Sequence, residues 1–96
     1  MKKEIYYTPH LKLRLKIREI PYDLPRKIYE TATEKYIDRE TGKKIVVKKV
    51  NYKNKTREMS VIYEEKINEI AIITIHPLKA YQKLSRLKSG RWEKIL

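Results

Sequence analysis

Apolar and polar positions in the second half of the chain follow a pattern that predicts β-strands. Residues 43–52 are β-branched and basic, residues 57–65 alternate apolar with polar side chains, and residues 69–77 are apolar on both faces. Short polar connectors at Asn54 and Asn68 separate these runs, as antiparallel hairpins require. We therefore expect three consecutive antiparallel strands, the last of them central in the sheet or covered.

The segments before and after these strands have apolar residues at helical spacing. Residues 22–38 carry an apolar side chain at every fourth position, with Asp23 as a cap and Pro25 in the first turn. Residues 78–88 follow a proline and predict a last helix, which Gly90 would end. The final residues could fold back as a short extended tail.

The segment YYTPHLKLRLKIREIP fits two structures. Its alternating leucines and cations suit a half-buried strand, whereas Thr8 followed by Pro9 is a typical helix start. Leucine and lysine have good helix propensity, so the helix is favoured. Its leucines do not share one helical face, which predicts a helix lying between two surfaces. On that helix His10, Arg14 and Arg18 line one stripe.

Together these elements predict an α+β fold and a single domain over residues 1–96. The expected order is two N-terminal helices, an antiparallel sheet of three to four strands and a C-terminal helix. Residues 4–8 would supply the additional short strand.

Composition limits the cellular compartments and the kinds of chemistry that fit the protein. The sequence has no apolar run long enough to span a membrane and no signal-peptide pattern at its start, so we expect a cytoplasmic protein without membrane contact. Cysteine is absent, which excludes disulfides, thiolate metal sites and cysteine nucleophiles. Abundant lysine and glutamate with little glutamine suggest a thermophilic source.

The net charge of +12 says most about function, because such an excess of positive charge usually serves to bind an anionic partner. Nucleic acid is the first candidate, an acidic protein the second and a membrane surface the third, and simple solubility remains open. The candidate nucleic-acid-binding residues are Lys44, Lys48, Lys49, Lys53, Lys55, Lys79, Lys83, Arg86 and Arg91. Lysine outnumbers arginine, which favours backbone contacts over base readout. Tyr52 and Trp92 could stack on bases, although Trp92 is better explained as part of the core.

Several short motifs follow one another in a recognisable order. They are Thr8-Pro9-His10, Arg14, Arg18-Glu19-Ile20 and Ile72-Ile73-Thr74-Ile75. With these motifs, the chain resembles the RelE/ParE toxin superfamily, and more narrowly its BrnT-type branch, over about residues 5–77. The resemblance implies an RNA-directed toxin held in check by an acidic antitoxin. Glu19 stands where the branch usually has glycine, and no tyrosine securely matches the C-terminal catalytic tyrosine of RNA-cleaving relatives.

Metal-independent RNA cleavage needs a base, an acid and cations around the phosphate. Two histidines, each beside a proline at a predicted helix start, could serve as the base and the acid. If the strands pair around residues 66–67, Arg57 lies opposite His76 and Met59 opposite Thr74, and these four residues share one face of the sheet. The candidate catalytic residues are His10, Arg14, Arg18, Arg57, Thr74 and His76. Each histidine could instead cap a helix, and the arginines could be a solvated helix face. No metal or cofactor is expected.

The sequence thus predicts a basic RNA-binding domain of a toxin–antitoxin type, which could also cleave RNA as an endoribonuclease. The alternative is a non-catalytic nucleic-acid-binding or protein-interaction module on the same scaffold. RNA versus DNA and the presence of a homo-oligomer stay open.

Overall fold

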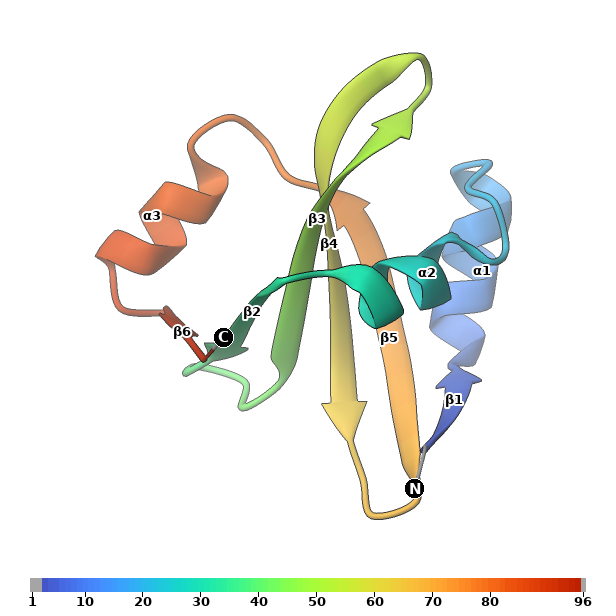
Figure 1. Cartoon of the computed structure of the whole chain (residues 1–96), viewed down its shortest axis with the longest axis horizontal. Helices are drawn as coiled ribbons and strands as arrows, with labels where there is room; N and C mark the ends of the chain where they lie inside the picture. Colours follow the sequence, from blue (N-terminus) through green and yellow to red (C-terminus); the bar gives the residue numbers. More distant parts are fainter. Residues whose placement is uncertain (1–2, 96) are drawn as a thin grey trace.

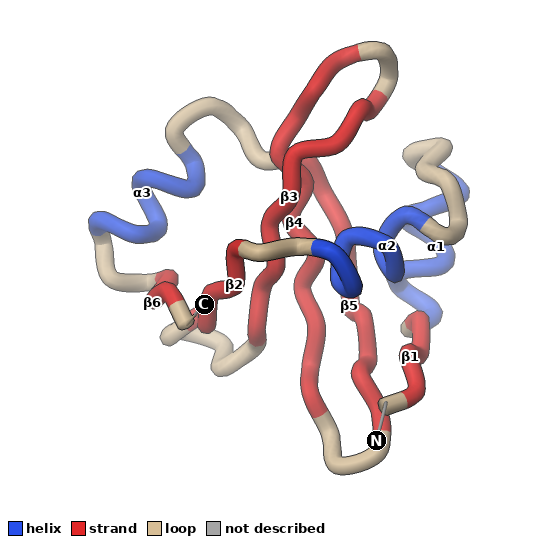
Figure 2. The backbone as a smooth tube through the Cα atoms, viewed as in Figure 1, coloured by secondary structure: helices blue, strands red, loops and turns tan. Residues whose placement is uncertain are grey.

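A computed structural model of the protein describes residues 3–95, and a six-stranded sheet runs through its centre (Figures 1 and 2). The strands are β1 (Glu4–Tyr7), β2 (Glu34–Asp38), β3 (Lys44–Tyr52), β4 (Lys55–Glu65), β5 (Glu69–Pro77) and β6 (Trp92–Lys94). The helices are α1 (Pro9–Ile17), α2 (Leu24–Thr31) and α3 (Gln82–Lys88). Across the sheet the order is β1-β5-β4-β3-β2-β6, and only β1 pairs in parallel, with β5.

The three central strands confirm the predicted meander. A two-residue turn joins β3 to β4, since Tyr52 pairs with Lys55 and the intervening Lys53 and Asn54 have φ of 51° and 64°. Two consecutive left-handed residues are the mark of a type I′ turn, whose twist matches that of the flanking strands.

The predicted sheet of three to four strands behind two N-terminal helices is wrong. Strand β1 is the first element within residues 3–95, and the predicted helix over residues 22–38 is helical only from Leu24 to Thr31 and continues as β2 from Glu34. Tertiary pairing overrides the helical spacing here, because Tyr36 pairs with Ile45 of β3 and its ring stacks on Trp92 of β6 at 5.6 Å between centroids. The expected short strand at residues 4–8 and the extended tail correspond to β1 and β6.

The two faces of the sheet have separate cores. Val46 packs with Leu11, Leu15 and Ile28 under α1 and α2, whereas its neighbours in β3 point to the opposite face. On that opposite face Ile45, Val47, Tyr36, Leu78 and Trp92 pack together, with Leu87 of α3 against them. Helix α2 therefore covers one side of the sheet and α3 the other, while α1 lies beside β5 at the sheet edge and turns Leu11 and Leu15 toward the side of α2 (Figure 1).

Helix α1 confirms the helical interpretation of the opening segment. Thr8 caps it, because the Thr8 hydroxyl accepts a hydrogen bond from the Leu11 amide at 3.2 Å. Only one surface covers the helix, however: Leu11 and Leu15 are buried, while Leu13 and Ile17 are 57% and 69% exposed. The expected second surface does not cover it.

The last helix is shorter than predicted. Residues 78–81 form a loop that ends at Tyr81, whose φ of 66° is left-handed, and α3 starts only at Gln82. Leu84, predicted on the apolar stripe, is 51% exposed. Gly90 ends this region as expected, with φ of 79° and its amide donating to the Leu87 carbonyl. Within residues 3–95 no helix is long and apolar enough to cross a membrane.

Candidate nucleic-acid interface

Cations that form no ion pair within residues 3–95 gather on three neighbouring segments. We call these segments the basic end: α1, the β3–β4 hairpin, and the stretch from Lys79 to Lys88. The unpaired cations there are Lys12, Arg14, Lys16, Arg18, Lys48, Lys49, Lys53, Lys55, Arg57, Lys79, Arg86 and Lys88. In Figure 1 the hairpin tip and the loop before α3 lie at the top, and the β4–β5 turn lies at the bottom.

Carboxylates neutralise most of the other cations; of those within residues 3–95, Lys35 and Lys94 also form no ion pair. Near the β4–β5 turn, Lys3 and Lys44 both bind Glu65, at 2.9 and 2.8 Å. Side-chain hydrogen bonds from Lys44 and then Lys3 lower the pKa of Glu65 to about 2. On the far strand pair, Arg91 binds Asp38 at 3.3 Å. Lys44 and Arg91, both predicted to bind nucleic acid, are thus engaged in ion pairs away from the hairpin tip.

A third predicted binding residue, Lys83, is also engaged. Its ammonium lies 2.6 Å from Glu58 of β4 and 2.9 Å from Glu34 of β2, and Glu34 also accepts a hydrogen bond from Tyr36 at 2.7 Å. Burial alone would lower the pKa of Lys83, but the two carboxylates raise it overall. The cluster ties α3 to the sheet. No sequence signal identified it, because Glu34 falls within the predicted helix.

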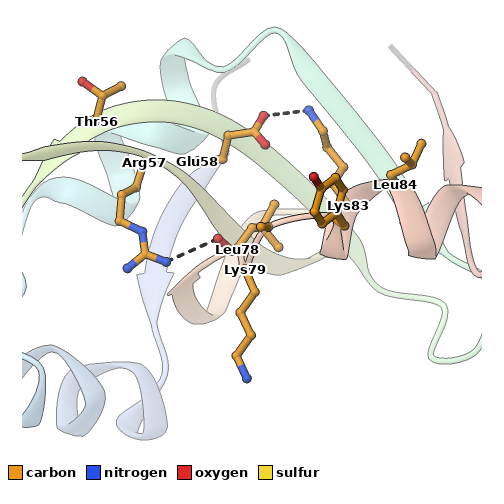
Figure 3. A pocket seen from close by; sticks show the side chains of 9 residues that line it. Thr56, Arg57, Glu58, Leu78, Lys79, Lys83 and Leu84 are labelled. Carbon is orange, nitrogen blue, oxygen red and sulfur yellow. Dashed lines mark hydrogen bonds and ion pairs between the residues drawn. The ribbon is translucent and has the colours of Figure 1, made fainter.

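Figure 3 shows the hollow of about 440 Å³ beside this cluster, between β4 and the segment that leads into α3. Arg57 and Lys79 point to one side of it, away from Glu58 and Lys83. Arg57 donates to the Leu78 carbonyl at 3.4 Å, which holds its guanidinium beside the loop.

Helix α1 lies against the upper half of β5, where β1 no longer pairs. The Thr8 amide donates to the Ile72 carbonyl and the Thr8 hydroxyl to the Ile73 carbonyl, both at 3.2 Å. From this anchor, a helix rises about 1.5 Å per residue and a strand about 3.3 Å. The six residues from Thr8 to Arg14 therefore cover about the same length as the three residues from Ile73 to His76. Arg14 and His76 thus lie at about the same height along β5.

His76 is half-buried and pairs with Ser60 of β4, whose hydroxyl donates to the His76 carbonyl at 3.1 Å. Burial and the positive charges of Arg14, Arg18 and Arg86 lower the pKa of His76. The imidazole is therefore neutral at neutral pH and can accept a proton.

Two donors near this histidine have no partner among the described residues. The Nε of Arg14 and the hydroxyl of Thr74 are buried without a hydrogen bond there. A buried donor left without an acceptor costs about 1–3 kcal/mol, so such atoms call for an explanation. Thr74 lies two residues before His76 and so faces the same side of the sheet. We call the set Arg14, Arg18, Thr74, His76 and Arg86 the anion site, because it offers donors and positive charge but contains no carboxylate.

The predicted catalytic residues are only partly brought together. Arg14, Arg18, Thr74 and His76 belong to the anion site. Strands β4 and β5 pair three residues away from the predicted register: two residues because the turn is longer, with Glu65 opposite Ile70, and one because of the shift between Ile62 and Tyr63. Ser60, not Arg57, is therefore the partner of His76, and the predicted pairing of Arg57 is wrong.

The same three-residue offset changes the other predicted pair. Met59 pairs with Pro77 instead of Thr74 and packs under α1 and α2, so the predicted shared face is also wrong. His76 lies inside β5, neither at a helix start nor capping one. His10 is exposed in the first turn of α1, as expected for a helix that begins at Pro9.

The aromatic residues have roles other than those first considered. Tyr52 is buried in the core beneath the hairpin, and Trp92 is buried against Tyr36, which confirms the core role predicted for Trp92. Tyr81, by contrast, is 82% exposed between Lys79 and Lys83. Sequence spacing missed it because it places Tyr81 on the apolar side of a helix that does not extend so far.

Within residues 3–95, no group of three or more His, Asp or Glu side chains could hold a metal ion. None of the protein-family models, curated proteins or solved structures compared with the chain matches it.

Proposed function

We propose that the protein binds single-stranded nucleic acid, RNA foremost, through phosphate contacts made by the basic end. The observation that carries this proposal is the segregation of charge. Every lysine around the β4–β5 turn is ion-paired, whereas within residues 3–95 the cations of α1, those from Lys48 to Arg57 in the hairpin, and those of residues 79–88 other than Lys83 form no ion pair. Lysines dominate this surface and form point-charge contacts with phosphates, so binding should depend little on base sequence.

The anion site would hold one phosphate of the bound strand. Arg14 Nε and the Thr74 hydroxyl are donors suited to phosphate oxygens, and Arg18 and Arg86 add positive charge. An exposed ring such as Tyr81 could stack on a neighbouring base.

RNA cleavage is the second candidate, and the lowered pKa of His76 beside Arg14 favours it. In this reaction neutral His76 takes the proton of a 2′-hydroxyl, and the 2′-oxygen attacks the adjacent phosphorus. The 5′-oxygen then leaves with a proton from an acid, and a 2′,3′-cyclic phosphate remains. His10, one turn before Arg14 on the same helical stripe, is the candidate acid.

The biological setting we propose is a cytoplasmic toxin of the RelE/ParE type, restrained by an acidic antitoxin. This part of the proposal rests on the sequence motifs that resemble that superfamily and on the net charge of +12.

The test is fluorescence anisotropy of labelled single-stranded RNA at several salt concentrations. Lys49→Gln/Lys53→Gln/Lys55→Gln should reduce the slope of log K against log salt by about 2, since each lost phosphate contact removes about 0.7. The matched variant Lys3→Gln/Lys43→Gln/Lys66→Gln removes the same charge from paired lysines and should leave the slope closer to that of the wild type. Equal losses in both variants would refute a localised interface.

Cleavage is read on the same RNA by gel electrophoresis. Products with cyclic phosphate ends that disappear in His76→Ala, while binding persists, would support catalysis at the anion site. Binding without any product in the wild type would leave the protein a non-catalytic RNA-binding module.

A further inference from the structure

Helix α1 presents an apolar ridge to solvent, on the side away from the sheet. Leu13 and Ile17 form the ridge and are 57% and 69% exposed, although Leu11 and Leu15 already supply the residues with which the helix packs on the core. Tyr22, 64% exposed, follows in the loop after α1. Single exposed apolar residues scattered over a surface are normal, but Leu13 and Ile17 lie one turn apart on one short helix.

A hollow lies on each side of this ridge. The smaller one, about 180 Å³, is lined by His10, Leu13, Arg14, Ile17 and Arg18. The larger one, about 550 Å³, is lined by Lys12, Leu13, Leu15, Lys16, Glu19, Ile20 and Tyr22. A ridge between two grooves is the shape into which the side chains of a second helix pack.

The rims of the two hollows identify the chemistry of the occupant. Lys12 and Lys16 border one side, Arg14 and Arg18 border the other, and none of the four has an ion pair within residues 3–95. Glu19 is the one carboxylate in either lining. A second copy of a chain with net charge +12 would be repelled, and nucleic acid would gain nothing from the leucine and isoleucine.

We propose that this ridge docks an acidic amphipathic helix of a partner protein. The apolar stripe of that helix would cover Leu13 and Ile17, and its flanking carboxylates would meet the cations on both rims. This mode of binding needs no contact with the β3–β4 hairpin.

The location also implies regulation, and this part rests on the proposed RNA binding. Arg14 and Arg18 line the smaller hollow and belong to the anion site. A helix docked on the ridge would therefore compete with a phosphate of the nucleic acid for the same guanidinium groups.

The experiment uses a fluorescent synthetic helical peptide with a leucine stripe flanked by glutamates, and a second peptide in which glutamine replaces every glutamate. We expect the acidic peptide to bind the wild-type protein, and Leu13→Ser/Ile17→Ser to weaken binding at least tenfold. The control Ile67→Ser changes an equally apolar residue, 89% exposed in the β4–β5 turn, and should bind as the wild type does. The glutamine peptide should bind at least tenfold more weakly.

Three outcomes would overturn the docking proposal. One is no binding of the acidic peptide, and another is binding that the Leu13/Ile17 double variant retains. The third is ridge-dependent binding of phosphatidylserine vesicles, or ridge-dependent self-association in the ultracentrifuge, in place of peptide binding. Displacement of labelled RNA by the peptide tests the competition separately. If the protein binds no RNA, the competition and the proposed function both fail, whereas the direct peptide titration still decides the docking.

Discussion

Replacing Lys83 with methionine tests the cluster that ties α3 to the sheet. The ammonium bridges Glu34 and Glu58, and the lysine side chain is 26% exposed. Removing it leaves two carboxylates facing each other with no cation. Breaking a fully buried pair costs about 3–5 kcal/mol, and an exposed pair is worth at most about 1. We expect about 2 kcal/mol for this partly buried site, or a loss of about 10 °C in melting temperature for a domain of this size.

The assay is urea unfolding followed by Trp92 fluorescence at pH 7 and pH 4. Burial by itself would raise the pKa of the Glu34 carboxyl. Hydrogen bonds from Lys83 and Tyr36 outweigh it and hold this pKa below its usual range. The stability that Glu34 provides is therefore present at pH 7 and is lost as the pH falls through its folded pKa. In Lys83→Met, acid instead relieves the repulsion between the carboxylates, so the difference from the wild type should shrink at pH 4.

Lys27→Met is the matched control for this prediction. It removes an equally long side chain from an exposed pair with Asp23, in which both side chains are more than 60% exposed. It should leave the free energy of unfolding close to that of the wild type, because solvent screens an exposed pair. Equal losses in the two variants at pH 7, or a loss in Lys83→Met that is the same at pH 4, would refute the reasoning.

Three further predictions concern the fold and the anion site. Trp92→Ala should lower the free energy of unfolding by about 3 kcal/mol in chemical denaturation, because it empties the stack on Tyr36. Lys53→Asn/Asn54→Gly should raise the melting temperature, with a gain of about 1 kcal/mol, since both positions are left-handed. The lowered folded pKa of His76 implies stability that is complete above its unfolded pKa of 6.5 and lost as the pH falls through the folded value. His76→Gln should therefore flatten the dependence of melting temperature on pH below 6.5, and an unchanged dependence would contradict this.

The central meander was predictable because its signals are local. Alternation and β-branched residues mark β3, β4 and β5, and the polar turn at Asn54 fixes how the first two connect. Strand β2 was not predictable in the same way. Tyr36 pairs with Lys94, far along the chain, and short strands of this kind form only when the sheet that receives them exists.

The candidate site shows the same division. The helical spacing of α1 correctly put Arg14 and Arg18 on one stripe, and the cap at Thr8 fixed where the helix begins. The residue opposite His76 could not be predicted from the sequence, because it depends on the exact length of the β4–β5 turn and on an irregularity between Ile62 and Tyr63. Together these move the register by three residues and place Ser60, not Arg57, opposite His76.

The most direct test of the central claim is an NMR titration of the protein with short single-stranded RNA, observing the Nε–H groups of the arginines. The account predicts a saturable shift of the Arg14 signal, assigned by its loss in Arg14→Lys, because that buried donor would gain a phosphate acceptor. Arg26, exposed on α2 and paired with Glu30, should not shift. No change at Arg14 when the RNA is saturating, or equal changes at Arg14 and Arg26, would contradict the account.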